Sequence, residues 1–262
     1  MEAPSRFDQA LAASLRRATV VGAVAAVVLG ALLAVFVHIV VGVLVMVVAG
    51  AAWVLWVQSA FASAASRVVS DLGRPVGQQD LPGFHNALEG VALLTGVAEP
   101  AVRLIESPAA NAMVVADRDS STVVVTSGLL ETDSAVQVEV LAAELLCRVR
   151  DGSARYATLV AGLPAPLKAA AGLGSASLAA TLGEQRALDG DFDAVAVTRY
   201  PPGLIAALEE MTERGTAVHG AQPQTAPLWI APAVGIDDGV DPAVDRTANQ
   251  PIEHRIAVLR EL

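Results

Sequence analysis

The sequence predicts an α+β protein in which helices surround a small β-sheet, behind an N-terminal hairpin of two transmembrane helices. Three observations support this fold class. Residues 18–57 carry no charged side chain, several later segments have apolar residues at helical spacing, and short β-rich runs lie between residues 101 and 126. The composition agrees, because 54% hydrophobic and 17% charged residues make the chain too apolar for an ordinary soluble protein.

The uncharged run at residues 18–57 predicts two membrane spans rather than one. One helix of about 40 residues would be about 60 Å long, twice a hydrocarbon core of about 30 Å. We therefore expect spans near residues 18–37 and 40–58, with His38 as an interfacial turn residue rather than a proton or metal site. A cleaved signal sequence does not fit, because its apolar region would be only about 7 to 15 residues long.

Basic residues flank the hairpin and predict its orientation. Arg16 and Arg17 precede the first span, Arg67 and Arg74 follow the second, and no Lys or Arg lies between them. Since cytoplasmic flanks are enriched in basic residues, we expect residues 1–17 and the rest of the chain after the hairpin to be cytoplasmic. The sequence thus predicts an integral protein of the cell (plasma) membrane, with the lipid bilayer as its first partner.

Charge and cysteine content exclude other classes of protein. The net charge of -10, without a basic cluster, would repel nucleic acid phosphates, so no nucleic acid partner is expected. The single cysteine, Cys147, excludes an internal disulfide.

After the hairpin, residues 59–80 are predicted to extend the second helix and then to form a linker, and residues 81–262 to form the soluble domain. Strands are expected at residues 101–105, 111–115 and 122–126. Residues 157–177 are apolar but interrupted by proline and glycine, which predicts a helical excursion that touches the membrane surface. Residues 215–250 are predicted to be mostly loop. The remaining segments are predicted helices, at residues 83–97, 134–150, 178–197, 201–212 and 251–262.

Four segments of the soluble domain carry a resemblance to a known family. They read HNALEGVALLTGV, NAMVVADRDSSTVVVTSGLLE, DAVAVTRYPPGLIAALEEM and PIEHRIAVLREL, in this order behind a membrane hairpin. Together they resemble the HtpX-like membrane zinc metallopeptidases, peptidase family forty-eight. The resemblance implies that residues 81–262 form a zincin-like peptidase-homology domain.

In that family an HExxH helix and a downstream ExxxD helix hold the zinc, and the glutamate of the first motif is the general base. The matching segments here read Ala143-Glu144-Leu145-Leu146-Cys147 and Ala187-Leu188-Asp189-Gly190-Asp191. The resemblance therefore makes Glu144 a remnant base. It also makes Ala143, Cys147 and Ala187 degenerate ligand positions, and Asp191 the retained carboxylate that supports the ligands.

Without these ligands, the sequence predicts no cofactor. Zinc activates water by lowering its pKa from about 15.7 to about 7, and Glu144 alone is at most a weak base toward bulk water. A displaced metal site built from Cys147, Glu184 and Asp191 stays open as an alternative. The residues themselves favour simpler roles, with Glu144 paired to Arg148 one turn later on an exposed helix and Cys147 a small buried apolar residue.

These expectations favour a pseudopeptidase that acts by binding. We expect the strand of Val123, Val124, Val125 and Thr126 to align extended peptides or membrane-protein clients by β-augmentation, which needs no metal. The alternative is an active, divergent HtpX-like metalloendopeptidase in membrane-protein quality control. A third reading is an inert membrane scaffold, and the oligomeric state stays open.

Overall fold

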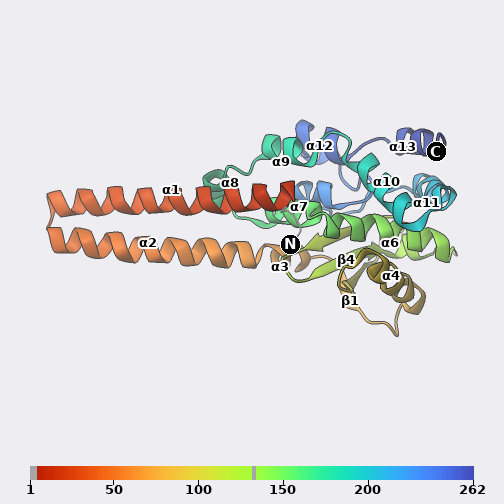
Figure 1. The fold of residues 1–262 in the computed structure, drawn as a ribbon, viewed down its shortest axis with the longest axis horizontal. Helices are drawn as coiled ribbons and strands as arrows, with labels where there is room; N and C mark the ends of the chain where they lie inside the picture. Colours follow the sequence, from red (N-terminus) through yellow and green to blue (C-terminus); the bar gives the residue numbers. More distant parts are fainter. Residues whose placement is uncertain (1–4, 132–133) are drawn as a thin grey trace.

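The computed structural model describes residues 5–131 and 134–262, and two long antiparallel helices dominate its outline (Figure 1). Helices α1 (Arg6–Phe36) and α2 (Ile39–Ala62) project together from the rest of the protein. The chain reverses at Val37 and His38, where the His38 Nδ1 accepts a hydrogen bond from the Val40 backbone N–H at 3.2 Å. The predicted hairpin is confirmed, although α1 begins well before the first predicted span.

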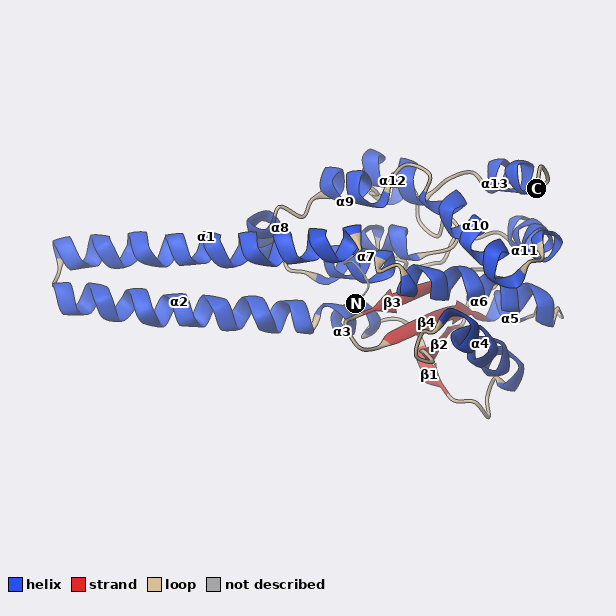
Figure 2. Ribbon diagram, viewed as in Figure 1, coloured by secondary structure: helices blue, strands red, loops and turns tan. Residues whose placement is uncertain are grey.

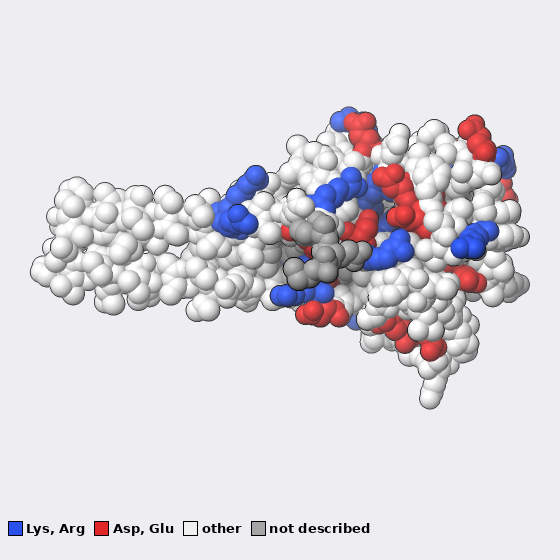
Figure 3. All heavy atoms as spheres, in the orientation of Figure 1, with Lys and Arg blue, Asp and Glu red and all other residues white. Residues whose placement is uncertain are grey.

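Close backbone contact at glycines holds the hairpin together. A Cβ added to Gly42 would lie 2.4 Å from the carbonyl oxygen of Gly30, and one added to Gly22 would lie 2.0 Å from the Trp53 ring. Trp53 Nε1 also donates a hydrogen bond to the Ala18 carbonyl at 2.9 Å. Both helices are long and apolar enough to cross a membrane. In the view of Figure 3 the projecting end of the hairpin shows no charged atoms, whereas a group of basic atoms lies on it closer to the domain.

A four-stranded mixed sheet forms the centre of the second part. Its strands are β1 (Arg74–Val76), β2 (Ala101–Ile105), β3 (Ala112–Ala116) and β4 (Ser121–Thr126), in the order β1-β2-β4-β3. β4 runs parallel to β2, whereas β1 and β3 are antiparallel to their neighbours. The three predicted strands are confirmed. β1 was missed within the predicted linker, because a three-residue edge strand with a central proline has almost no pattern to recognise.

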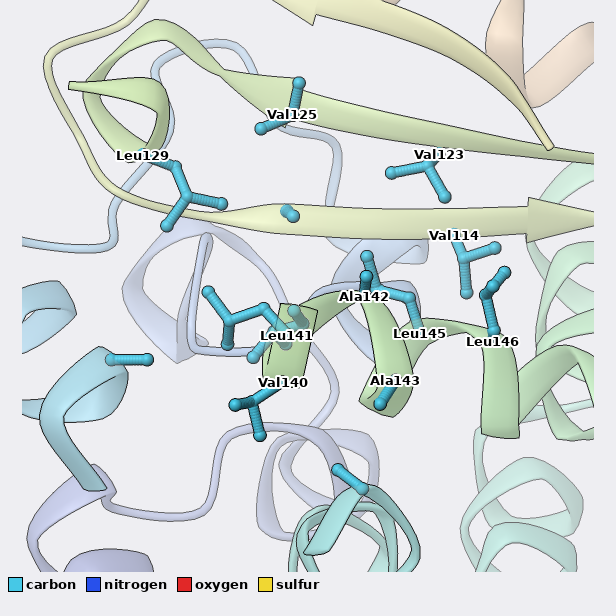
Figure 4. Close-up of a cluster of buried hydrophobic side chains, with 14 of the residues drawn as sticks. Val114, Val123, Val125, Leu129, Val140, Leu141, Ala142, Ala143, Leu145 and Leu146 are labelled. Carbon is cyan, nitrogen blue, oxygen red and sulfur yellow. The ribbon is translucent and has the colours of Figure 1, made fainter. Parts of the chain in front are cut away.

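Helices cover both faces of the sheet. On one face, α4 (Pro82–Thr95) and α6 (Ala135–Arg150) pack against residues such as Val114 and Val123, and Figure 4 shows Val114 beside Leu146 of α6. On the other face, Met113 and Val124 pack against α7 (Ser153–Gly162). Burial on both faces explains why β3 and β4 are almost uninterrupted apolar runs.

The remaining elements are short helices arranged around this core, and Figure 2 shows the strands as one small group among them. In chain order they are α3 (Ala64–Val69), α5 (Ser127–Leu130), α8 (Ala165–Ala171), α9 (Ser175–Leu182), α10 (Arg186–Thr198), α11 (Pro201–Arg214), the 3₁₀ turns η1 (Pro223–Leu228) and η2 (Ile236–Asp238), α12 (Pro242–Ala248) and α13 (Ile252–Leu259).

One predicted helix is wrong in detail. The helix predicted at residues 178–197 is two helices, α9 and α10, because Gly183 adopts φ +90° and interrupts it. Residues 215–250 are mostly loop, as predicted, but they also contain α12, which the sequence analysis missed and whose start is capped by the Asp241 carboxylate accepting from the Ala243 N–H at 2.9 Å.

Residues 157–177 join the hairpin to the rest of the protein. α7 is mostly buried, and with the start of α1 it forms an apolar cluster that includes Phe7, Leu11, Tyr156 and Leu167. α8 lies alongside α1, where Gly172 approaches Arg17. The base of the hairpin is therefore packed into the domain rather than attached by a free linker.

Candidate functional site

The predicted active-site helix forms as expected, as α6 (Ala135–Arg150), and its central glutamate is fully buried. Glu144 is 0% exposed, and α10 crosses directly over it. The crossing is close because Gly190 has no side chain. A Cβ there would lie 3.3 Å from both Cγ and Oε1 of Glu144. Glu144 therefore lies in a dry helix–helix contact, away from solvent.

Two arginines contact the Glu144 carboxylate. Arg148, one turn later on α6, donates to Oε1, and Nη2 of Arg255 on α13 lies 3.3 Å from Oε2. Arg255 also donates from Nε to Oδ2 of Asp191 on α10 at 2.8 Å. All four residues are at least 97% buried. The Glu144–Arg148 pair that the sequence favoured is present, but it is buried rather than exposed, and it belongs to a four-residue network joining α6, α10 and α13.

The same arginines bind the main chain of a neighbouring segment. Arg148 Nη1 donates to the Trp229 carbonyl at 2.9 Å, and Arg255 Nη1 donates to the Ile230 carbonyl at 2.7 Å. This segment also covers the outer edge of β3, through an antiparallel bridge between Met113 and Trp229 and a 2.9 Å hydrogen bond from the Ile230 N–H to the Ala112 carbonyl. An extended piece of the chain itself therefore occupies the sheet edge beside Glu144.

The surroundings set the protonation of these buried groups. Burial raises the pKa of Asp191, against the opposing charge of Arg255. Burial alone would lower the pKa of Arg255, but the Glu144 and Asp191 carboxylates outweigh it and raise the pKa, so the guanidinium stays charged. Burial raises the pKa of the Cys147 thiol to about 11, which keeps it protonated at neutral pH.

A third arginine is buried nearby without full compensation. Arg186, at the start of α10, is 6% exposed, and its Nε and Nη2 have no hydrogen-bond partner among residues 5–131 and 134–262. Burial and, to a smaller extent, the charge of Arg148 lower its pKa to about 9, against the Asp151 and Glu144 carboxylates, which act to raise it.

The structure brings most of the predicted site residues together. Ala143 and Cys147 lie buried on α6, Ala187 is buried on α10, and Asp191 faces Arg255. The alternative metal site of Cys147, Glu184 and Asp191 does not assemble, since no group of three potential His, Cys, Asp or Glu ligands occurs in the described part of the chain.

The predicted peptide-binding strand needs a correction. β4, with Val123, Val124, Val125 and Thr126, is an interior strand paired with β2 on one side and β3 on the other. These four side chains are fully buried. Strand addition requires a free edge, so β4 has no position at which a peptide could pair. Of the two edge strands, β3 is covered by the Trp229–Ile230 segment and β1 is short and contains Pro75.

Sequence reasoning missed Arg255, the residue with the most contacts in the site. It lies 64 positions from Asp191 and 111 from Glu144, so no spacing rule connects them. The available signal was its helix: an arginine on an apolar helix face in PIEHRIAVLREL needs a buried acidic partner.

Comparison with known proteins gives a distant relationship to one group of membrane peptidases. Proteins described as "Protease HtpX homolog" from Dictyoglomus turgidum and Dictyoglomus thermophilum are each 28% identical to this chain, over 218 and 221 residues, covering 70% of this chain and 70% of the relative. The counterpart from Streptococcus pyogenes serotype M3 is 23% identical over 219 residues, covering 68% of this chain and 74% of the relative.

No family model and no solved structure matches the chain. The chain is therefore a distant homologue of the HtpX proteases, with two candidate membrane helices at its N-terminus.

Proposed function

We propose that this chain is a membrane-anchored HtpX-like pseudopeptidase, with its soluble domain in the cytoplasm, that binds membrane-protein clients without cleaving them. The observation that carries the proposal is the pair of guanidinium groups on Glu144. A general base must contact the water that it deprotonates. Here Arg148 and Arg255 engage both carboxylate oxygens, and Gly190 closes the approach from α10.

The residues around Glu144 do not fit the zinc ion that the distant relationship implies. The alanine side chains at 143 and 187 have no donor atom, and the thiol of Cys147 is held protonated by burial. Arg148 and Arg255 supply positive charge within hydrogen-bond distance of Glu144, which opposes a second cation there. The two guanidiniums instead balance the Glu144 and Asp191 carboxylates.

The binding role is supported by the anchoring and by the closed sheet edge. A membrane-spanning hairpin would hold the domain at a bilayer, where membrane proteins are the neighbouring molecules, and the two candidate membrane helices support this placement. The Trp229–Ile230 segment already fills the edge beside Glu144, so we expect clients to contact the outer surface of the domain rather than that edge. The arginine residues on both sides of the hairpin support the cytoplasmic placement.

Zinc content and proteolysis of the full chain in detergent test the loss of catalysis. We expect substoichiometric zinc after incubation with the metal, and equal absence of cleavage of an unfolded membrane protein by the wild type and by Glu144→Gln. One zinc per chain, with cleavage that Glu144→Gln abolishes, would establish the active metalloendopeptidase instead. Binding of the same unfolded protein to the chain in nanodiscs tests the client role, and no saturable binding would leave only a scaffold.

A further inference from the structure

A pocket of about 320 Å³ opens where the hairpin enters the domain. Its apolar wall comes from Leu15 of α1, Phe61 of α2 and Leu159 of α7. The rest of the lining includes charged side chains from α7 and from the turn between β3 and β4. The four charged side chains are Arg155, Asp117, Arg118 and Asp119.

The pocket lies at the depth of lipid headgroups if the hairpin spans the bilayer as proposed. Leu15 is three residues before the uncharged run at residues 18–57 and Phe61 is four residues after it. These offsets correspond to about 4.5 and 6 Å along a helix. The interfacial region on each side of the hydrocarbon core is about 5 to 8 Å thick. The pocket therefore opens into the layer that holds phosphates and head amines.

The charged part of the lining carries both signs. The Asp117 carboxylate accepts from the Asp119 and Ser120 N–H groups at 2.8 and 2.9 Å. Partial burial alone would raise the pKa of Asp117, but these hydrogen bonds and the charge of Arg155 lower it, so it is ionised at neutral pH. Arg155 Nη1 lies 3.7 Å from the Asp8 carboxylate, whereas Arg118 has no ion-pair partner within the described residues.

We infer that this pocket binds the headgroup of a phosphatidylethanolamine-type lipid from the leaflet facing the domain. A guanidinium group can donate two parallel hydrogen bonds to the oxygens of a phosphate. The pocket lining contains two such groups, those of Arg118 and Arg155. A primary ammonium donates hydrogen bonds to carboxylates, here Asp117 and Asp119, which a quaternary choline cannot do. A headgroup that has a phosphate but no amine could use the two arginines but would supply no ammonium to these two carboxylates. The apolar wall at Leu15 and Phe61 suits the start of the acyl chains.

The inference rests on the proposed membrane anchoring and not on the loss of catalysis. Its test is lipid retention by the full chain, measured by native mass spectrometry after exchange into dioleoyl-phosphatidylethanolamine, -phosphatidylglycerol or -phosphatidylcholine. We expect preferential retention of one phosphatidylethanolamine, about tenfold weaker in Arg118→Gln and in Arg155→Gln. Arg74→Gln, which removes an exposed arginine of β1, is the matched control and should retain the lipid as the wild type does.

Asp119→Asn distinguishes the ammonium contact from the phosphate contact. We expect it to shift retention from phosphatidylethanolamine toward phosphatidylglycerol, because one repelling carboxylate is gone. Equal retention of all three lipids by the wild type, or unchanged phosphatidylethanolamine retention in both arginine variants, would overturn the inference. Carbonate extraction of membranes separates the anchoring hypothesis from the lipid-binding hypothesis. A chain that carbonate extracts would contradict the membrane anchoring itself. A chain that stays in the membrane but shows no lipid preference would contradict only lipid binding in the pocket.

Discussion

Replacing Arg255 by methionine should be among the most destabilising single changes in this protein. Arg255 is 0% exposed and donates to Asp191, Glu144 and the Ile230 carbonyl. Methionine fills similar space but leaves the Asp191 carboxylate buried without its arginine. Removing one partner of a buried ion pair costs about 3 to 5 kcal/mol. For a chain of this size we expect a melting temperature roughly 6 to 20 °C lower.

The assay is thermal unfolding of the full chain in detergent, followed by near-ultraviolet circular dichroism, to which the buried Trp229 contributes. Arg74→Met is the matched control, because the Arg74–Glu106 pair spans 3.9 Å with side chains 57% and 71% exposed. Such a surface pair contributes less than about 1 kcal/mol. If Arg255→Met and Arg74→Met lose the same stability, the buried network does not hold the helices together and the reasoning fails.

Two further measurements locate the cause of the loss. The double variant of Arg255→Met and Asp191→Asn should lose less stability than the sum of the two single variants. The reason is that Asp191→Asn removes the carboxylate that Arg255→Met would leave buried without a cation. Lowering the pH should also reduce the loss of stability caused by Arg255→Met. A carboxylate buried without its cation has a folded-state pKa above its unfolded value, so the stability lost near pH 7 returns as the pH falls below the folded pKa. A cost that is independent of pH would assign the effect to packing alone.

Three other changes test separate contacts. Gly190→Ala should destabilise the domain by about 1 to 3 kcal/mol, since its Cβ would lie 3.3 Å from a buried carboxylate. Gly90→Ala, on an open face of α4, is the control and should be neutral or stabilising by up to about 1 kcal/mol. Chemical denaturation of both variants measures the two changes in the free energy of unfolding. Burial raises the pKa of the Cys147 thiol to about 11, so little of the reactive thiolate is present at pH 8. We expect the native protein to react with iodoacetamide at pH 8 at least about 100-fold more slowly than the unfolded protein. Comparable rates would show that the thiol is not buried. Gly42→Ala should lower the melting temperature of the hairpin in detergent micelles, since its Cβ would lie 2.4 Å from a backbone oxygen. Gly50→Ala is the control and should not lower it, because the nearest atom to its Cβ would be 3.8 Å away. Equal effects of the two substitutions would contradict the close contact between the two helices.

Local patterns in the sequence were enough to predict the hairpin, strands β2, β3 and β4, and helix α6. Each of these is encoded within a contiguous stretch: the uncharged run at residues 18–57, the β-branched runs and the apolar spacing of residues 134–150. The same reasoning failed where the local signal is short or interrupted, as at β1, at Gly183 and at α12.

Only the tertiary structure decided what surrounds Glu144. The sequence named Glu144, Ala143, Cys147, Ala187 and Asp191 as the positions of interest, and α6 and α10 do bring them together. It did not place Arg255 between the two carboxylates, nor the Trp229–Ile230 segment on the sheet edge. Those contacts include pairs more than 110 positions apart in the sequence, such as Arg255 with Glu144 and Trp229 with Met113. They form because buried charges and unpaired strand edges need partners that only the packed chain provides.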